Sequence, residues 1–99
     1  MHVILGFTGA ARDITKRKEL TLSLENNMTY QDITRLLGVQ YPELIGLIID
    51  QDRQTLLSGN LLVINGDLTN PAMVMSESPK DGDRLILMSV ISGGKSFNL

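Results

Sequence analysis

The sequence of 99 residues has no cysteine, no tryptophan and one histidine. Without cysteine the chain can form no disulfide, no thiolate nucleophile and no thiolate metal site. The histidine, His2, follows the first residue, and we expect no catalytic or metal-binding role for it. The acidic pairs in turns, Asp50 with Asp52 and Asp81 with Asp83, are typical of solvated carboxylates, so we expect no metal site. Because the sequence groups no nucleophile with a base and oxyanion donors, it predicts a protein that is not an enzyme.

A strong net charge and a long apolar run are also missing. The net charge of -2 is too small to attract nucleic acid or a membrane surface by bulk electrostatics. No uncharged apolar segment approaches the roughly 20 residues that span a bilayer, and the N-terminus lacks the features of a signal peptide. We therefore expect a cytoplasmic domain with one core that binds neither nucleic acid nor membrane. A small basic cluster is interpreted as a solvated strand entrance, with contact to an acidic partner or RNA as the alternative; it comprises Arg12, Lys16, Arg17 and Lys18.

Apolar patterns in the chain predict four main strands. The branched apolar run at residues 2–7 indicates a buried strand. Leu20, Leu22 and Leu24 alternate with polar residues, which is the period of a strand with one face in the core. The predicted strands are residues 2–7, 18–25, 61–65 and 84–91, with a strand fragment at 72–75 inside a loop over 69–79. Turns are predicted at Gly59-Asn60, Asn65-Gly66 and residues 81–83.

One main helix is predicted after residue 28. Thr29 is a suitable N-cap, and Asp32 lies in the first turn, where the helix dipole favours a negative charge. Ile33, Leu36 and Leu37 follow at helical spacing, and Gly38 is placed to end the helix. A proline suits the first position of a short helical turn, which we expect to begin at Pro42.

The two terminal strands, residues 2–7 and 84–91, are each apolar on both faces. We therefore place them side by side in the centre of a sheet, parallel to each other if the helix makes the crossover. The first two strands are expected to pair antiparallel. The predicted fold class is α+β, with a mixed sheet of four to five strands and one main helix on one face, which is the β-grasp arrangement.

A glycine pair, Gly93-Gly94, directly follows the last predicted strand. If this pair ended the chain, a tail without side chains could thread a narrow channel in a partner and present its carboxylate to ATP. The resulting acyl-adenylate would be open to attack by sulfide, a thiol or an amine. Such a carrier is a substrate and needs no catalytic residues of its own.

Three stretches resemble the MoaD and ThiS family of ubiquitin-like sulfur carriers: GFTGAARD with Phe7 and Arg12, LLVING at residues 61–66, and DGDRLILMSVISGG at 81–94. The stretch DRQTLLSGNLLVINGDLTN is similar to the ubiquitin-related modifier branch. The resemblance covers nearly the whole chain, although residues 26–57 match only in pattern.

This resemblance implies a function and a set of partners. An activating enzyme uses ATP to adenylate the terminal glycine, and the chain itself holds no cofactor. A thiocarboxylate then forms, and a sulfur-acceptor synthase passes its sulfur to molybdopterin, thiazole, tRNA or another small product. Some relatives are instead joined to lysines of target proteins.

The sequence departs from the family at its end, because five residues follow Gly94: Lys95, Ser96, Phe97, Asn98 and Leu99. An amide at Gly94 cannot be adenylated as an acid would be. Three explanations stay open. A JAMM-type metalloprotease removes the tail, as in relatives made as precursors; the uncut tail docks in a partner groove as part of a non-covalent binding module; or the glycine pair is an unrelated loop. We expect a β-grasp domain over residues 1–94 and a removable tail over 95–99.

A docking surface is predicted on the last strand. If Leu85 and Leu87 point to the helix, alternate residues point to the opposite face and are exposed unless covered. These residues are Ile86, Met88 and Val90. The resemblance places the family's docking patch on that face, and methionine suits a surface that fits several partners. A covering loop or a dimer contact is the alternative.

Overall fold

A five-stranded mixed sheet forms the framework of the computed structural model, which describes residues 1–89. The strands are β1 (His2–Phe7), β2 (Glu19–Ser23), β3 (Asn60–Ile64), β4 (Asp67–Thr69) and β5 (Arg84–Ser89). They lie in the order β2-β1-β5-β3-β4, with β1 and β5 parallel at the centre and the other neighbours antiparallel. The predicted central pairing of the terminal strands and the antiparallel N-terminal pair are both confirmed.

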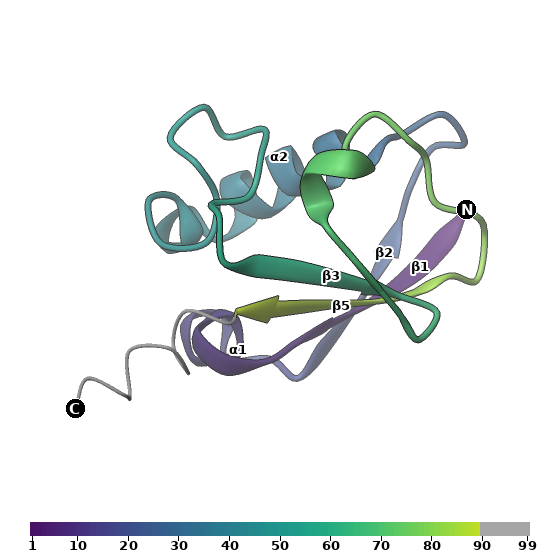
Figure 1. Ribbon diagram of the computed structural model, residues 1–99. Helices are drawn as coiled ribbons and strands as arrows, with labels where there is room; N and C mark the ends of the chain where they lie inside the picture. Colours follow the sequence, from purple (N-terminus) through teal and green to yellow (C-terminus); the bar gives the residue numbers. More distant parts are fainter. Residues whose placement is uncertain (90–99) are drawn as a thin grey trace.

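Two helices flank this sheet. Helix α2 (Tyr30–Gln40) lies across one face, and helix α1 (Gly9–Thr15) lies beside the end of β5 (Figure 1). Two short 3₁₀ helices, η1 (Pro42–Leu44) and η2 (Pro71–Met73), shape the loops between α2 and β5. Within residues 1–89 neither helix is long and apolar enough to cross a membrane.

The core fills the space between α2 and the sheet. Alternate residues of the two central strands point into it, and on β5 these are Leu85 and Leu87, each 1% exposed. Burial of large aliphatic side chains of this kind contributes about 1.5–3 kcal/mol each and is the main force that holds helix to sheet. The buried apolar residues of the strands and α2 are Val3, Leu5, Phe7, Tyr30, Ile33, Leu37, Leu62, Leu85 and Leu87.

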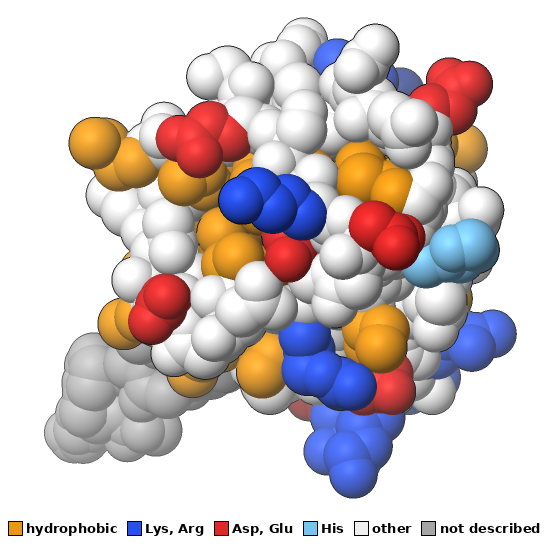
Figure 2. Space-filling view, turned by 90° about the vertical axis from the view of Figure 1, so that its right-hand side faces the viewer, with side chains coloured by type: hydrophobic (Ala, Val, Ile, Leu, Met, Phe, Trp, Pro, Cys, Tyr) orange, Lys and Arg blue, Asp and Glu red, His pale blue; other side chains and the backbone are white. Residues whose placement is uncertain are grey.

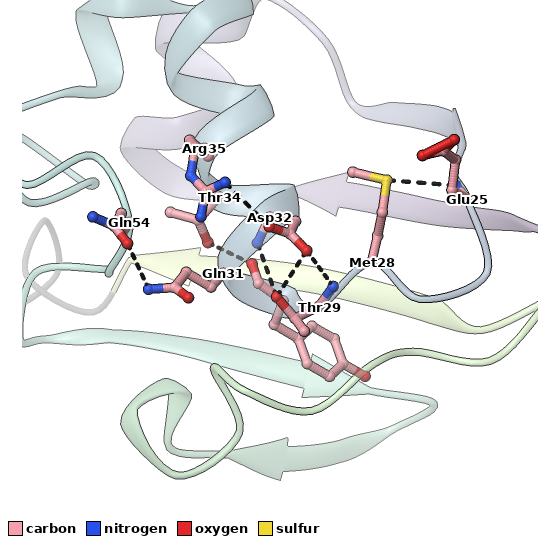
Figure 3. A network of polar contacts seen from close by, with 9 residues as sticks. Glu25, Met28, Thr29, Gln31, Asp32, Thr34, Arg35 and Gln54 are labelled. Atoms are coloured by element: carbon pink, nitrogen blue, oxygen red, sulfur yellow. Dashed lines mark hydrogen bonds and ion pairs between the residues drawn. The ribbon is translucent and has the colours of Figure 1, made fainter.

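The predicted start of α2 is confirmed by a capping box (Figure 3). The Asp32 N–H donates to Thr29 Oγ1 at 3.2 Å, and the Thr29 N–H donates to Asp32 Oδ2 at 2.9 Å. Two backbone N–H groups that a helix start leaves without partners are thereby satisfied. The hydrogen bond from the Thr29 backbone lowers the pKa of Asp32. The Thr29 hydroxyl, which donates to Asp32 Oδ2, and Arg35, whose Nη1 lies 3.2 Å from Asp32 Oδ1, lower this pKa further.

Two predictions about local structure are wrong. Helix α2 does not end at Gly38 but runs to Gln40, and Gly38 is buried inside it. A Cβ at Gly38 would lie 3.5 Å from Ile45 Cδ1, so this glycine serves the close packing of the following segment. No strand fragment forms at residues 72–75, because Pro71 opens η2 instead and the Asn70 side chain accepts the Ala72 N–H at 3.1 Å.

Two elements were not anticipated. Helix α1 occupies the polar stretch after β1, and β4 pairs with β3 across the predicted Asn65-Gly66 turn. Both turn residues have positive φ, 49° at Asn65 and 90° at Gly66, as a tight two-residue hairpin turn requires.

We predict that Asp32→Asn destabilises the domain near neutral pH and has progressively less effect as the solution is acidified. The folded-state pKa of Asp32 is depressed, so its stabilisation is present above the unfolded pKa and is lost as the pH falls through the folded value. Urea denaturation of both proteins across the acidic range measures this difference. Asp13→Asn, an exposed aspartate on α1, is the control for loss of a charge. A difference between wild type and Asp32→Asn that does not change with pH would contradict the assignment.

Candidate partner-docking face

The face of the sheet opposite α2 carries an apolar patch. On β5, Ile86 is partly exposed and Met88 is 36% exposed, while Leu85 and Leu87 point into the core. The predicted alternation along this strand is therefore confirmed, and within residues 1–89 no loop buries Met88. Val90, predicted to extend the patch, lies outside the described residues.

Strand pairing adds residues from three other strands to this face. Ile86 lies between Val63 of β3 and Gly6 of β1, and Met88 lies opposite Leu61. Val63 in turn pairs with Leu68 of β4, which is 64% exposed. We call the apolar residues of this face the outer patch; they are Ile4, Leu61, Val63, Leu68, Ile86 and Met88.

Sequence reasoning found two members of the outer patch and missed four. Alternation along one strand identifies Ile86 and Met88, but it cannot say which residues of other strands lie beside them. The turn at Asn65-Gly66 sets the β3–β4 register, so Val63 and Leu68 could have been paired from that signal alone.

Charged side chains border the outer patch. Arg84 Nη1 lies 3.4 Å from Glu19 Oε2, and both side chains are more than half exposed, so this ion pair adds little stability. Figure 2 shows lysine and arginine side chains gathered in the lower part of the view, on the side of the sheet away from α2. In a chain of net charge -2, this border is locally positive.

The C-terminal end of β5 is held by Thr8, the residue that precedes α1. The Thr8 N–H and the Thr8 hydroxyl both donate to Leu87 O at 3.2 Å. This contact holds the end of the central strand against the loop that leads into α1 (Figure 1). The predicted functional pair, Gly93 and Gly94, and the tail over residues 95–99 lie beyond Ser89, outside the described residues.

Asp81 and Asp83, the acidic pair that was expected to be solvated, make hydrogen bonds at the opposite end of β5. Asp81 Oδ1 accepts the His2 N–H at 2.7 Å. Asp83 accepts the Lys80 N–H at 2.8 Å and the Asn65 Nδ2–H at 2.9 Å. Both carboxylates stay accessible to solvent, as expected, and they also join the start of β1 and the β3–β4 turn to the turn that precedes β5.

We predict that Asp83→Ala lowers the free energy of unfolding by about 1–2 kcal/mol, because it removes two hydrogen bonds worth about 0.5–1.5 kcal/mol each. Chemical denaturation measures the change. Asp67→Ala is the matched control, since the Asp67 carboxylate makes no hydrogen bond to residues 1–89. Equal losses in the two variants would show that the contacts of Asp83 do not contribute.

Comparisons with known proteins agree with this geometry. The model of the ThiS family matches residues 5–94, and no curated protein matches the chain. The small archaeal modifier protein SAMP1 of Haloferax volcanii has a TM-score of 0.76 at 18% identity, over 95% of this chain and 100% of its own.

Two further solved structures share the fold. Urm1 of Trypanosoma brucei has a TM-score of 0.71 at 25% identity, over 90% of this chain and 91% of its own. A putative molybdopterin converting factor subunit 1 of Pyrococcus furiosus has a TM-score of 0.65 at 17% identity, over 87% of this chain and 93% of its own. These likenesses confirm the predicted β-grasp fold, and the family match confirms the resemblance drawn from the sequence motifs.

Proposed function

The chain belongs to the ThiS family, and we therefore propose that it is a ubiquitin-like carrier that delivers sulfur from a thiocarboxylate on Gly94. Members of this family are small carriers or modifiers that work with activating enzymes and with targets. The observation that carries the proposal is the family match through residue 94, which includes both glycines and stops where the extra tail begins.

The proposed sequence of steps begins with proteolysis. Water cleaves the Gly94–Lys95 amide and leaves a free carboxylate on Gly94 and a five-residue peptide. The carboxylate attacks the α-phosphate of ATP on an activating enzyme, and pyrophosphate leaves. Hydrosulfide then attacks the acyl-adenylate, AMP leaves, and the thiocarboxylate forms. The domain over residues 1–94 supplies both the recognised surface and, at Gly94, the reacting carboxyl group.

The outer patch is the surface that we assign to the activating enzyme. It includes Ile86 and Met88 of β5, the strand that precedes the glycine pair in the sequence, so we expect a partner bound there to reach the reacting carboxyl group. Apolar side chains that stay exposed on a sheet face are typical of interaction sites. The proposed contact comprises Ile86, Met88 and Val90.

A second function, attachment to lysines of target proteins, is favoured by the likeness to SAMP1, which is described as a modifier protein. The activation chemistry would be the same, but a lysine amine would take the place of hydrosulfide and form an isopeptide bond. Lysine-branched remnants in tryptic digests of host proteins would identify this outcome.

We predict that a chain ending at Gly94 gains a thiocarboxylate when it is incubated with the host's activating enzyme, ATP and sulfide, whereas the 99-residue chain does not. The full chain has no carboxylate at Gly94. Intact-mass spectrometry detects the exchange of one oxygen for sulfur, and the chain ending at Gly94 without ATP is the control.

The same measurement on protein from the native host tests the processing step. We expect a form that ends at Gly94. If only the 99-residue form is found, and removal of residues 95–99 abolishes binding to a partner, the chain acts as a non-covalent binding module with an uncut tail.

We predict that Met88→Asp in the chain ending at Gly94 raises the KM for the activating enzyme about tenfold or more with little change in kcat, as for a hot-spot residue of an interface. Pyrophosphate release at varied carrier concentrations measures both constants. Met73→Asp is the matched control, because Met73 is 74% exposed on η2, away from the outer patch. Equal effects of the two substitutions on KM would show that the outer patch is not the docking surface.

A further inference from the structure

A hollow of about 220 Å³ opens on the outer face of the sheet over Gly6. Gly6 lies between Glu19 of β2 and Ile86 of β5, so a missing side chain here leaves a gap in the middle of the sheet. Ile4 and Ile86 form apolar walls, and the hollow adjoins the outer patch.

The backbone does not require glycine at this position. Gly6 is not among the residues with positive φ, so its conformation suits any residue. A Cβ at Gly6 would meet Ile86 Cγ1 and Leu85 O at 3.6 Å, which is ordinary van der Waals contact. The hollow therefore exists only because no side chain fills it, and glycine within a strand costs stability that a larger residue would restore.

The rim of the hollow is cationic. Arg12 of α1, Lys18 and Arg84 border it, and Glu19 is the one acidic residue among its lining residues within positions 1–89. Glu19 pairs with Arg84, whereas Arg12 and Lys18 form no ion pair with the described part of the chain. Two positive charges therefore lie beside the apolar walls of the hollow.

The size of the hollow limits what it can hold. Sites for cofactors and other small molecules usually enclose about 300–1,000 Å³. A smaller, open hollow suits one protruding side chain, and interface hot spots are commonly single side chains seated in such pockets. The positive rim complements a partner with carboxylates beside that side chain.

We propose that the hollow over Gly6 receives an apolar side chain of the activating enzyme, flanked by carboxylates that pair with Arg12 and Lys18. This inference rests on the proposed function, because it specifies the chemistry of the same docking partner. In this role we call the hollow the socket. Gly6 is then a specificity-determining position, because a larger residue would leave the fold intact and fill the socket.

A peptide titration tests the socket without the enzyme. Acetyl-Glu-Phe-Glu-amide, added to the isotope-labelled 99-residue chain, should shift the amide signals of Gly6, Arg84 and Ile86. Acetyl-Lys-Phe-Lys-amide and acetyl-Glu-Ala-Glu-amide should produce weaker shifts, because each lacks one part of the required chemistry. Gly6→Val should abolish the shifts, and the double variant Arg12→Gln, Lys18→Gln should weaken binding about fivefold or more.

Several results would overturn the proposal. Unchanged peptide binding in Gly6→Val, or shifts located elsewhere on the chain, would show that the hollow is not the socket. A uridine oligonucleotide that binds these residues more tightly than the acidic peptide would assign the basic rim to RNA. If Gly6→Val does not fold, the double variant Arg12→Gln, Lys18→Gln decides instead, and unchanged peptide binding in that variant would contradict the proposal.

Enzyme kinetics separate this inference from the proposed function. Gly6→Val should raise the KM for the activating enzyme about tenfold with kcat unchanged, whereas Thr21→Val, on the neighbouring strand of the same face, should not. If the chain ending at Gly94 is never adenylated in any form, the proposed function fails and the peptide titration alone decides on the socket. If adenylation proceeds and ignores Gly6→Val, only the socket fails.

Discussion

The parallel pairing of β1 with β5 is the contact on which the rest of the structure depends. It joins strands that are far apart in the sequence, for example at Ile4 and Arg84, and the chain between them includes the helix that lies across one face of the sheet. The same pairing decides which side chains enter the core, brings Gly6 beside Ile86 to form the hollow, and directs the end of β5 toward α1. The core, the outer patch and the hollow therefore depend on the same strand pairing.

Register along this pair has to be correct to the residue. A slip by one position would turn Ile86 and Met88 into the core and expose Leu85 and Leu87. The polar contacts of Asp81 and Asp83 act against such a slip, because they join the turn that precedes β5 to the start of β1 and to the β3–β4 turn. The DGD stretch at residues 81–83 therefore helps to fix the register of β5 against its neighbouring strands.

Regular patterns made much of this fold predictable. Strand β1 was predicted with its observed bounds, and the capping residues of α2 were identified, because strand runs and helix caps depend on near neighbours in the sequence. Helix α1 was missed because its buried residues are the small Ala11 and Thr15, which leave no apolar stripe. Gly38 was wrongly predicted to end the helix, because its contact with Ile45 arises from tertiary packing that the local sequence does not show. The hollow needs three strands at once, and no single segment reveals it.

The parallel arrangement also governs how the domain would respond to force. The start of β1 and the end of β5 lie at opposite ends of the same strand pair. A pull on the chain beyond Ser89, resisted at the start of β1, would load the hydrogen bonds between these strands together, in shear, instead of opening them one after another. The β1–β5 pair is thus arranged to resist force along the chain better than a strand pair whose hydrogen bonds open from one end.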